Sequence, residues 1–176
     1  EYMPMIALFD NEETGSGTRC GALSDFLPST VSRICHALSM DREKELMVRA
    51  SSFMLSSDNG HAVHPNHAEK ADPTNRPYPN GGVLIKYSAQ QKYMTDSFSG
   101  AYVKKLCLDN GIPFQVFHNH SDIPGGSTLG NLSSEAFSVI GADVGMAQLA
   151  MHSPYESAGT EDPMNMLRLF RVFLGR

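Results

Sequence analysis

The sequence has few cysteines, no long apolar run and no excess of cationic residues, and each absence excludes a class of protein. Its three cysteines, Cys20, Cys35 and Cys107, are widely spaced and form no CxxC pair, so neither a disulfide framework nor a thiolate zinc site is expected. No apolar stretch approaches the roughly 20 residues of a membrane-spanning helix. With 14 Lys and Arg against 19 Asp and Glu, the chain offers no cationic surface to a nucleic-acid backbone. We therefore expect a cytoplasmic protein with no membrane and no nucleic-acid partner.

Length and composition fit one domain. The 176 residues, of which 41% are hydrophobic, can bury one core, and nothing calls for two independent domains. The sequence opens on Glu1-Tyr2-Met3-Pro4, without an initiator methionine or a leader segment. We therefore expect the chain to be part of a longer protein.

Strand-like and helix-like segments alternate along the chain. Short apolar segments bounded by polar or turn residues predict strands at residues 3–9, 51–57, 83–87, 114–117 and 139–144. Helical spacing of apolar residues predicts helices at residues 17–40, bent or divided at Pro28, and at 41–49, 97–110 and 162–174, with Gly111 ending the third. Residues 65–82 and 125–130 are expected to be loops. The alternation predicts an α/β fold with αβα layers around a largely parallel or mixed sheet.

Acidic and imidazole side chains follow two of the predicted strands. Glu12 and Glu13 come directly after the first strand and point apart, so one could bind a metal while the other faces a bound water as general base. An exposed acidic turn is the alternative. Asp58 follows the next strand, with His61 and His64 nearby, and these side chains offer the oxygen and nitrogen ligands that catalytic zinc accepts. The alternative for the two histidines is a plain surface position.

Three further features have both a functional and a structural interpretation. His152 follows an apolar segment, where it is either a ligand or a buried, hydrogen-bonded histidine. Residues 125–130 could cradle a phosphate, but they lack the GxxxxGK[ST] lysine and the GxGxxG order, which favours a peptide-binding loop. Ser127 and Ser153 lack a GxSxG elbow, which disfavours nucleophilic catalysis. Among the 10 methionines, those on apolar faces are expected to fill the core: Met3, Met5, Met47, Met54 and Met166.

Five short blocks carry the most distinctive sequence. They are DNEETGS at residues 10–16, SDNGHAVHPN at 57–66, VLIK at 83–86 with Tyr93 after it, DIPGGSTLG at 122–130 and LAMHS at 149–153. In order and spacing they resemble the aspartyl aminopeptidases, a family of two-zinc metallopeptidases. The resemblance runs over nearly the whole chain, and it implies that residues 1–176 are the C-terminal portion of a zinc aminopeptidase catalytic domain.

The resemblance implies a role for each metal-site candidate. Glu12 would be the general base. Glu13 and His152 would bind one zinc, and Asp58 would bind the other. Family members add a histidine ligand and a bridging carboxylate from an N-terminal portion, and they carry an inserted dimerisation domain. None of these has a counterpart in this sequence, so the αβα fold is expected to be incomplete and the isolated chain inactive.

The same resemblance implies a substrate pocket. His61, Lys86 and Tyr93 would line it, while Gly125 and Gly126 would border it. Tyr93 would stabilise the oxyanion that forms when water attacks the scissile carbonyl. Lys86 would pair with the side chain of an N-terminal Asp or Glu. A cation at the end of an apolar strand can also extend to solvent, which is the alternative for Lys86.

The implied function is the removal of an acidic residue from peptides with a free N-terminus, by a homo-oligomer. The sequence departs from the family at His120, where an arginine is expected, and at Pro154-Tyr155 after the last block, which leaves specificity open. Two alternatives remain. One is a two-metal aminopeptidase that prefers neutral residues, and the other is a non-catalytic subunit with an incomplete metal site.

Overall fold

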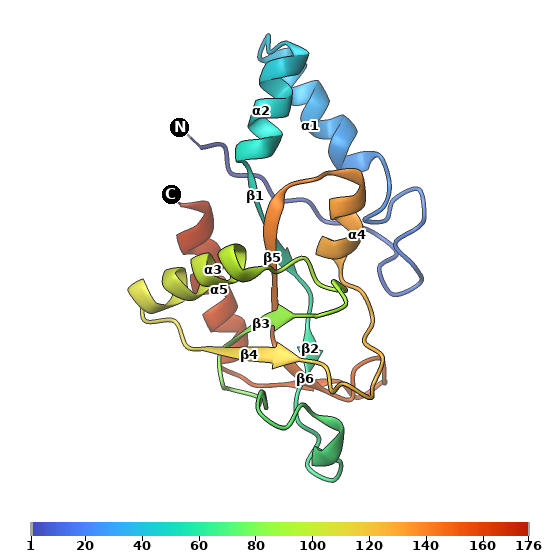
Figure 1. The fold of residues 1–176 in the computed structure, drawn as a ribbon, viewed down its shortest axis with the longest axis vertical. Helices are drawn as coiled ribbons and strands as arrows, with labels where there is room; N and C mark the ends of the chain where they lie inside the picture. Colours follow the sequence, from blue (N-terminus) through green and yellow to red (C-terminus); the bar gives the residue numbers. More distant parts are fainter. Residues whose placement is uncertain (1, 176) are drawn as a thin grey trace.

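The computed structural model describes residues 2–175, which form two β-sheets and the helices around them (Figure 1). The strand order of the main sheet is β1-β5-β3-β4. These strands are β1 (Phe53–Ser57), β5 (Ile140–Gly145), β3 (Val83–Tyr87) and β4 (Phe114–His118). β1 pairs with β5 and β3 with β4 in parallel, whereas β3 and β5 are antiparallel. The sheet is therefore mixed, and the predicted α/β class is confirmed.

A smaller sheet continues from the ends of β1 and β5. It contains β2 (Gly60–His61), β6 (Ala147–Leu149) and β7 (Ser157–Ala158), in the order β2-β6-β7. β2 is parallel to β6, as β1 is to β5 in the main sheet. Because both pairs run in the same sense, the segments that follow β1 and β5 leave the main sheet at the same end.

One face of the main sheet packs against two helices, α3 (Ser97–Asp109) and α5 (Asp162–Leu174). Val83 and Ile85 of β3 are fully buried on this face, among the buried helix side chains Val103, Leu106 and Leu169. Burying each such aliphatic side chain contributes about 1.5–3 kcal/mol relative to leaving it in water. This two-helix layer is the main core of the domain.

The opposite face carries a different set of side chains, because alternate residues of a strand point to opposite sides. Leu84 of β3 lies there with Tyr93 and Phe117 in a second apolar cluster. Lys86 has the same parity as Leu84, so it also points to this face. Helix α4 (Leu129–Ala136) packs on this side against β1 and β5. The candidates Lys86 and Tyr93 therefore share the face that α3 and α5 do not cover.

The helical prediction for residues 17–49 resolves into two helices that stand beyond one end of the sheet, α1 (Phe26–Ala37) and α2 (Arg42–Ser51) (Figure 1). Pro28 neither bends nor divides α1, because it lies in the first turn, where a missing backbone N–H costs nothing. Asp41 caps α2 by accepting a hydrogen bond from the Lys44 backbone N at 2.8 Å. Residues 65–82 form the predicted loop, with one short 3-10 turn, η1 (Ala68–Lys70).

The predicted strand at residues 3–9 is wrong. No strand of the described chain pairs with this segment, and an extended segment needs a hydrogen-bonded neighbour to become a strand. Its side chains at Met3, Ile6 and Leu8 are exposed, while Ala7 and Phe9 pack at the edge of the α1 cluster. The methionine prediction is correspondingly mixed: Met166 is buried and Met54 is half-buried, but the exposed members are Met3, Met5 and Met47.

Other boundaries follow the predictions closely. β3 and α5 have the predicted limits, and α3 stops just before Gly111, whose φ of 62° is the left-handed conformation that ends many helices. The glycine-rich loop, however, runs directly into α4, whose N-cap is Thr128. Among residues 2–175, no helix combines the length and apolarity needed to cross a membrane.

Candidate metal and substrate site

The side chain of Lys86 reaches the turn after β1 that carries Asp58. Lys86 is opposite Asp143 on β5, which in turn is opposite Ser56 on β1, two residues before Asp58. The Lys86 ammonium donates to the backbone carbonyl of Asp58 at 3.3 Å and to that of Asn59 at 2.9 Å. Only 3% of Lys86 is exposed, so the alternative of a side chain that extends to solvent is wrong. Lys86 instead holds the turn that carries Asp58.

The charge of Lys86 is set by this buried position. Burial lowers the pKa of the Lys86 ammonium, while the nearby carboxylates of Asp58, Asp143 and Glu12 act in the opposite direction. The ammonium also lies 4.7 Å from the centre of the Tyr93 ring, within the range of a cation–π contact. Three negative groups and one aromatic face thus surround a single buried cation.

Glu13 and His152 form a direct contact between distant parts of the chain. The Nε2 atom of His152 lies 2.9 Å from Oε2 of Glu13, and about two thirds of each side chain is exposed. The alternative of a buried structural histidine is therefore wrong for His152. Two ligands of one tetrahedral zinc lie about 3.4 Å apart, so this pair is close to the separation that a shared metal ion requires.

Glu12 points to a more enclosed position than its neighbour. Burial raises the pKa of the Glu12 carboxyl, and the negative charges of Asp58 and Glu13 raise it further, while His152 and Lys86 oppose the shift. The two glutamates therefore have different environments. A carboxyl group with a raised pKa is suited to accept and release a proton near neutral pH.

Asp58 lies deeper than the Glu13 and His152 pair. Burial raises the pKa of the Asp58 carboxyl, Lys86 opposes that shift, and Asp143 and Glu13 add to it. Within residues 2–175, no group of three or more His, Cys, Asp or Glu side chains is arranged to hold a metal ion. The two donors that do meet, the Glu13 carboxylate and the His152 imidazole, are of the type that catalytic zinc uses.

Tyr93 is fixed by a neighbour that the sequence did not single out. Its phenol oxygen accepts a hydrogen bond from Asn119 Nδ2 at 2.8 Å, and burial raises the pKa of the phenol. Because that oxygen is already an acceptor, the Tyr93 proton remains free to be donated. Gly125 abuts the same amide, since a methyl group at this position would overlap the side chain of Asn119. Gly126 faces open space.

His61 and Asn59 complete the surroundings. His61, at the end of β2, has a pKa lowered by partial burial and by the positive charges of Lys86 and His152. The side chain of Asn59 accepts from the Met146 backbone N at 3.0 Å and donates to Gln148 Oε1 at 2.9 Å. It therefore ties the Asp58 turn to β6, the strand that leads to His152. Sequence reasoning missed this role because it depends on a contact between distant segments.

Two loops that carry candidate metal ligands contain unusual backbone conformations. Asn11, just before the glutamate pair, has a φ of 63°, and His152 itself has a φ of 67°. Such left-handed conformations are uncommon for residues other than glycine and cluster at functional sites. The His152 loop is held by a hydrogen bond of 2.6 Å from the His152 backbone N to Glu156 Oε1. The sequence pattern gave no signal for either conformation.

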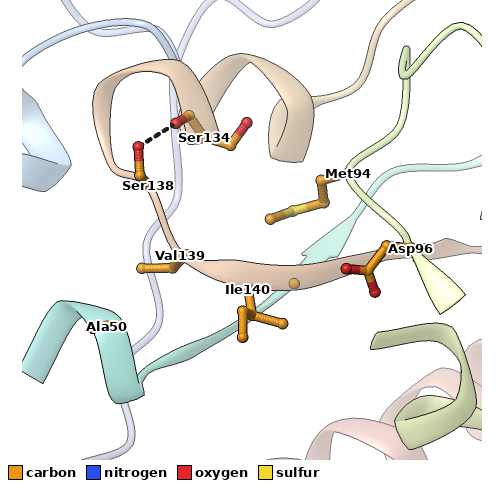
Figure 2. A pocket seen from close by; sticks show the side chains of 8 residues that line it. Ala50, Met94, Asp96, Ser134, Ser138, Val139 and Ile140 are labelled. Atoms are coloured by element: carbon orange, nitrogen blue, oxygen red, sulfur yellow. Dashed lines mark hydrogen bonds between the residues drawn. The ribbon is translucent and has the colours of Figure 1, made fainter. Parts of the chain in front are cut away.

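One open hollow of the described chain lies away from these residues. It has a volume of about 450 Å³ and is lined by residues that include Ala50, Met94 and Ile140 (Figure 2). Ile140 begins β5 and is opposite Phe53, which begins β1, whereas Asp58 follows the other end of β1. The hollow is therefore at the opposite end of these strands from the candidate metal ligands.

Comparisons with known proteins identify the family of the chain. The family model for the aminopeptidase I zinc metalloproteases (M18) matches residues 1–174. A probable M18 family aminopeptidase 2 of Clostridium acetobutylicum is 46% identical over 173 residues, which are 98% of this chain and 40% of that protein. The matches define the class as zinc metallopeptidases. Within that class, the chain belongs to the M18 aminopeptidase family, and the resemblance found in the five blocks is confirmed at this level.

Solved structures of the family share the fold. The crystal structure of an M18 aminopeptidase from Thermotoga maritima has a TM-score of 0.85 at 28% identity, covering 94% of this chain and 38% of that one. The S. cerevisiae mApe1 dodecamer has a TM-score of 0.80 at 30% identity, covering 96% of this chain and 37% of that one. The chain spans about two fifths of the length of these relatives.

Proposed function

We propose that this chain forms part of a zinc aminopeptidase that removes one residue at a time from the N-terminus of peptides. The observation that carries the proposal is the contact of 2.9 Å between Glu13 and His152, two side chains from opposite parts of the chain. Glu12 and Asp58 lie close enough to Glu13 and His152 for the charges of that pair to change the pKa values of both carboxyl groups. Membership of the M18 aminopeptidase family also supports this proposed activity.

The metal centre would take two zinc ions. Glu13 and His152 would hold one ion and Asp58 the other, with the remaining ligands supplied by sequence that the longer family members have and this chain does not span. Zinc bound there would lower the pKa of a water molecule and polarise the scissile carbonyl. The cluster fits this use because its donors are carboxylate and imidazole groups.

The chain's own side chains would handle the proton and the developing charge. Glu12 would accept the proton of the attacking water and later deliver a proton to the departing amine. Tyr93 would donate its free O–H to the developing oxyanion, since Asn119 already donates to the phenol oxygen. His61 would line the pocket, and Gly125 and Gly126 would leave room for the peptide backbone.

Preference for an acidic N-terminal residue would come from Lys86. Two of the three ammonium protons are donated to the carbonyls of Asp58 and Asn59, which leaves one for a substrate carboxylate. A substrate with a neutral side chain would leave that proton unused. The alternative is an enzyme that prefers neutral N-terminal residues. In that enzyme Lys86 would only hydrogen-bond the turn that carries Asp58 and would not contact the substrate side chain.

The function is tested with the full-length enzyme and pairs of peptides that differ only in N-terminal acetylation. We expect single residues to be released from the free peptides alone, activity to disappear after chelation and activity to return with zinc. Cleavage of acetylated peptides, or full activity of the metal-free protein, would contradict the proposal. Zinc analysis of this 176-residue chain expressed alone should find less than one tightly bound ion. A full-length protein that binds no zinc would favour the non-catalytic subunit.

We also propose that the enzyme is a homo-oligomer in the cytoplasm. Support comes from the yeast dodecamer, from the exposed apolar side chains Tyr2, Ile6 and Leu8, and from β4, an edge strand of the main sheet. The free thiols Cys20, Cys35 and Cys107 suit a reducing compartment. Light scattering of the full-length enzyme tests the assembly, and a monomeric mass would contradict it.

A further inference from the structure

A row of side chains crosses the main sheet on the face that carries Lys86. In register across β1, β5, β3 and β4, it consists of Ser56, Asp143, Lys86 and Phe117. Asp143, in the middle, is fully buried. A buried carboxylate is costly unless it is paired, so its retention at the centre of a sheet calls for a reason. The proposed mechanism gives it none.

Asp143 holds the segment that follows Tyr93. Its Oδ2 atom accepts a hydrogen bond from the Met94 backbone N at 2.7 Å, and its own backbone N donates to Thr95 Oγ1 at 2.8 Å. Residues 88–95 belong to no helix or strand, so the segment has no ladder of its own to fix it. These two bonds fix the residues directly after Tyr93, while Asn119 fixes the phenol end of that side chain.

The second carboxylate oxygen of Asp143, Oδ1, lies beside Gly130 of α4. Oδ1 is buried and has no hydrogen-bond partner within the described chain. The negative charge of Asp143 favours the charged form of Lys86, and the Lys86 ammonium lies against the Tyr93 ring. A methyl group on Gly130 would come within 2.8 Å of Oδ1, so α4 closes over this oxygen. One carboxylate thus connects the Tyr93 segment with the strand that carries Lys86.

We propose that Asp143 is a positioning residue that fixes the Tyr93 hydroxyl where the oxyanion forms. This inference rests on the proposed peptidase function. Asp143 touches neither substrate nor metal in this role; it acts through the backbone of Met94 and the side chain of Thr95. Because an oxyanion donor acts mainly in the transition state, misplacing Tyr93 should lower kcat more than it changes KM.

The test is a double-mutant cycle in the full-length enzyme, with Asp143→Ala and Tyr93→Phe alone and together. We expect Asp143→Ala to lower kcat about 10- to 100-fold with KM within about twofold, and to have less than about a threefold effect once Tyr93 is Phe. Asp143→Asn keeps an oxygen acceptor for Met94 and should lose much less. If Asp143→Ala does not fold, Asp143→Asn replaces it in the cycle with Tyr93→Phe. Hydrogen exchange of the peptide that contains Met94 should be faster in Asp143→Ala and unchanged in Tyr93→Phe.

Two results would overturn the positioning role. One is an equal loss of kcat from Asp143→Ala with and without the Tyr93 hydroxyl, which would mean a general structural effect. The other is full activity of both Asp143 variants. An unmutated enzyme that does not cleave peptides, or one in which Tyr93→Phe has no effect on kcat, would instead refute the proposed function or the role of Tyr93 within it, and the inference about Asp143 with it.

Discussion

The backbone of Gly145 runs directly against the carbonyl group of Asp58. A methyl group at Gly145 would overlap the Asp58 carbonyl and come within 2.8 Å of the Asn59 Cα atom. Neither neighbour is the flexible end of a side chain, so the turn itself would have to move. The last residue of β5 therefore sets the position of a candidate metal ligand that directly follows the adjacent strand, β1.

Gly145→Ala in the full-length enzyme should displace the Asp58 turn. We expect a loss of about 1–3 kcal/mol in the free energy of unfolding, as for other overpacked sites, and a lower zinc content. Gly17→Ala is the matched control, because a methyl group there meets no atom within 4 Å. Denaturant unfolding and metal analysis measure both effects. Equal behaviour of the two variants would contradict the packing argument.

Glu12→Gln and Glu13→Gln should separate the two roles assigned to the adjacent glutamates. Glu12→Gln removes the proton acceptor but keeps its shape, so turnover should fall about 100-fold or more while zinc content stays unchanged. Glu13→Gln should lose zinc, because an amide is a poorer ligand than a carboxylate. Turnover and zinc content are measured on the same preparations. If both variants kept their metal, or both lost it, the assignment would be wrong.

Lys86→Met should abolish the preference for acidic N-terminal residues. A charge-assisted contact of about 1.5–3 kcal/mol corresponds to a preference of roughly 10- to 150-fold, measured as kcat/KM for peptides beginning with Asp, Glu, Leu and Ala. Neutral substrates should also be cleaved more slowly, since the Asp58 turn loses its ammonium. Lys105→Met is the control, as 75% of that side chain is exposed. An acidic preference that survives in Lys86→Met would refute this specificity role.

The three thiols should differ in reactivity. Cys20 is exposed, whereas burial raises the pKa of Cys107 to about 11, so at pH 8 only about one Cys107 in a thousand is a thiolate. Iodoacetamide should therefore modify Cys20 first, as peptide mapping would show. A thiol whose pKa is raised in the folded state stabilises it fully below the unfolded pKa near 9, and this contribution is lost as pH rises toward 11. Cys107→Ser should weaken that alkaline destabilisation, and rapid alkylation of Cys107 at pH 8 would contradict its burial.

The fold was most predictable where local pattern and burial agree. β3 is buried on both faces and reads as a continuous apolar run, and α3 ends at a glycine that takes a left-handed conformation. Residues 3–9 have the same apolar character, but strand formation depends on a neighbour that the described chain does not provide. α4 was missed because Gly130 and its serines resemble loop sequence, and β2 and β7 are only two residues long.

Some contacts among the candidate site residues could be predicted from the sequence, but the contacts that support them could not. Glu13 and His152 meet, and Lys86 lies with Tyr93, as their blocks led us to expect. The supporting contacts of Asn59, Asn119 and Asp143 could not be predicted, because each joins segments that are far apart in the sequence. These contacts can be identified only from the three-dimensional structure, in which the strands are paired.

The hydrogen bonds from Lys86 to the Asp58 and Asn59 carbonyls constrain how this enzyme could be redesigned or could evolve. In the proposed function, one ammonium would support a candidate metal ligand and would also offer its remaining proton to the substrate, so a change of charge at this position would alter both at once. New substrate preferences should therefore arise more readily at Gly126, which faces open space, or at His61, than at Lys86. A library built on those two positions would leave the Asp58 turn unchanged while the proposed pocket varies.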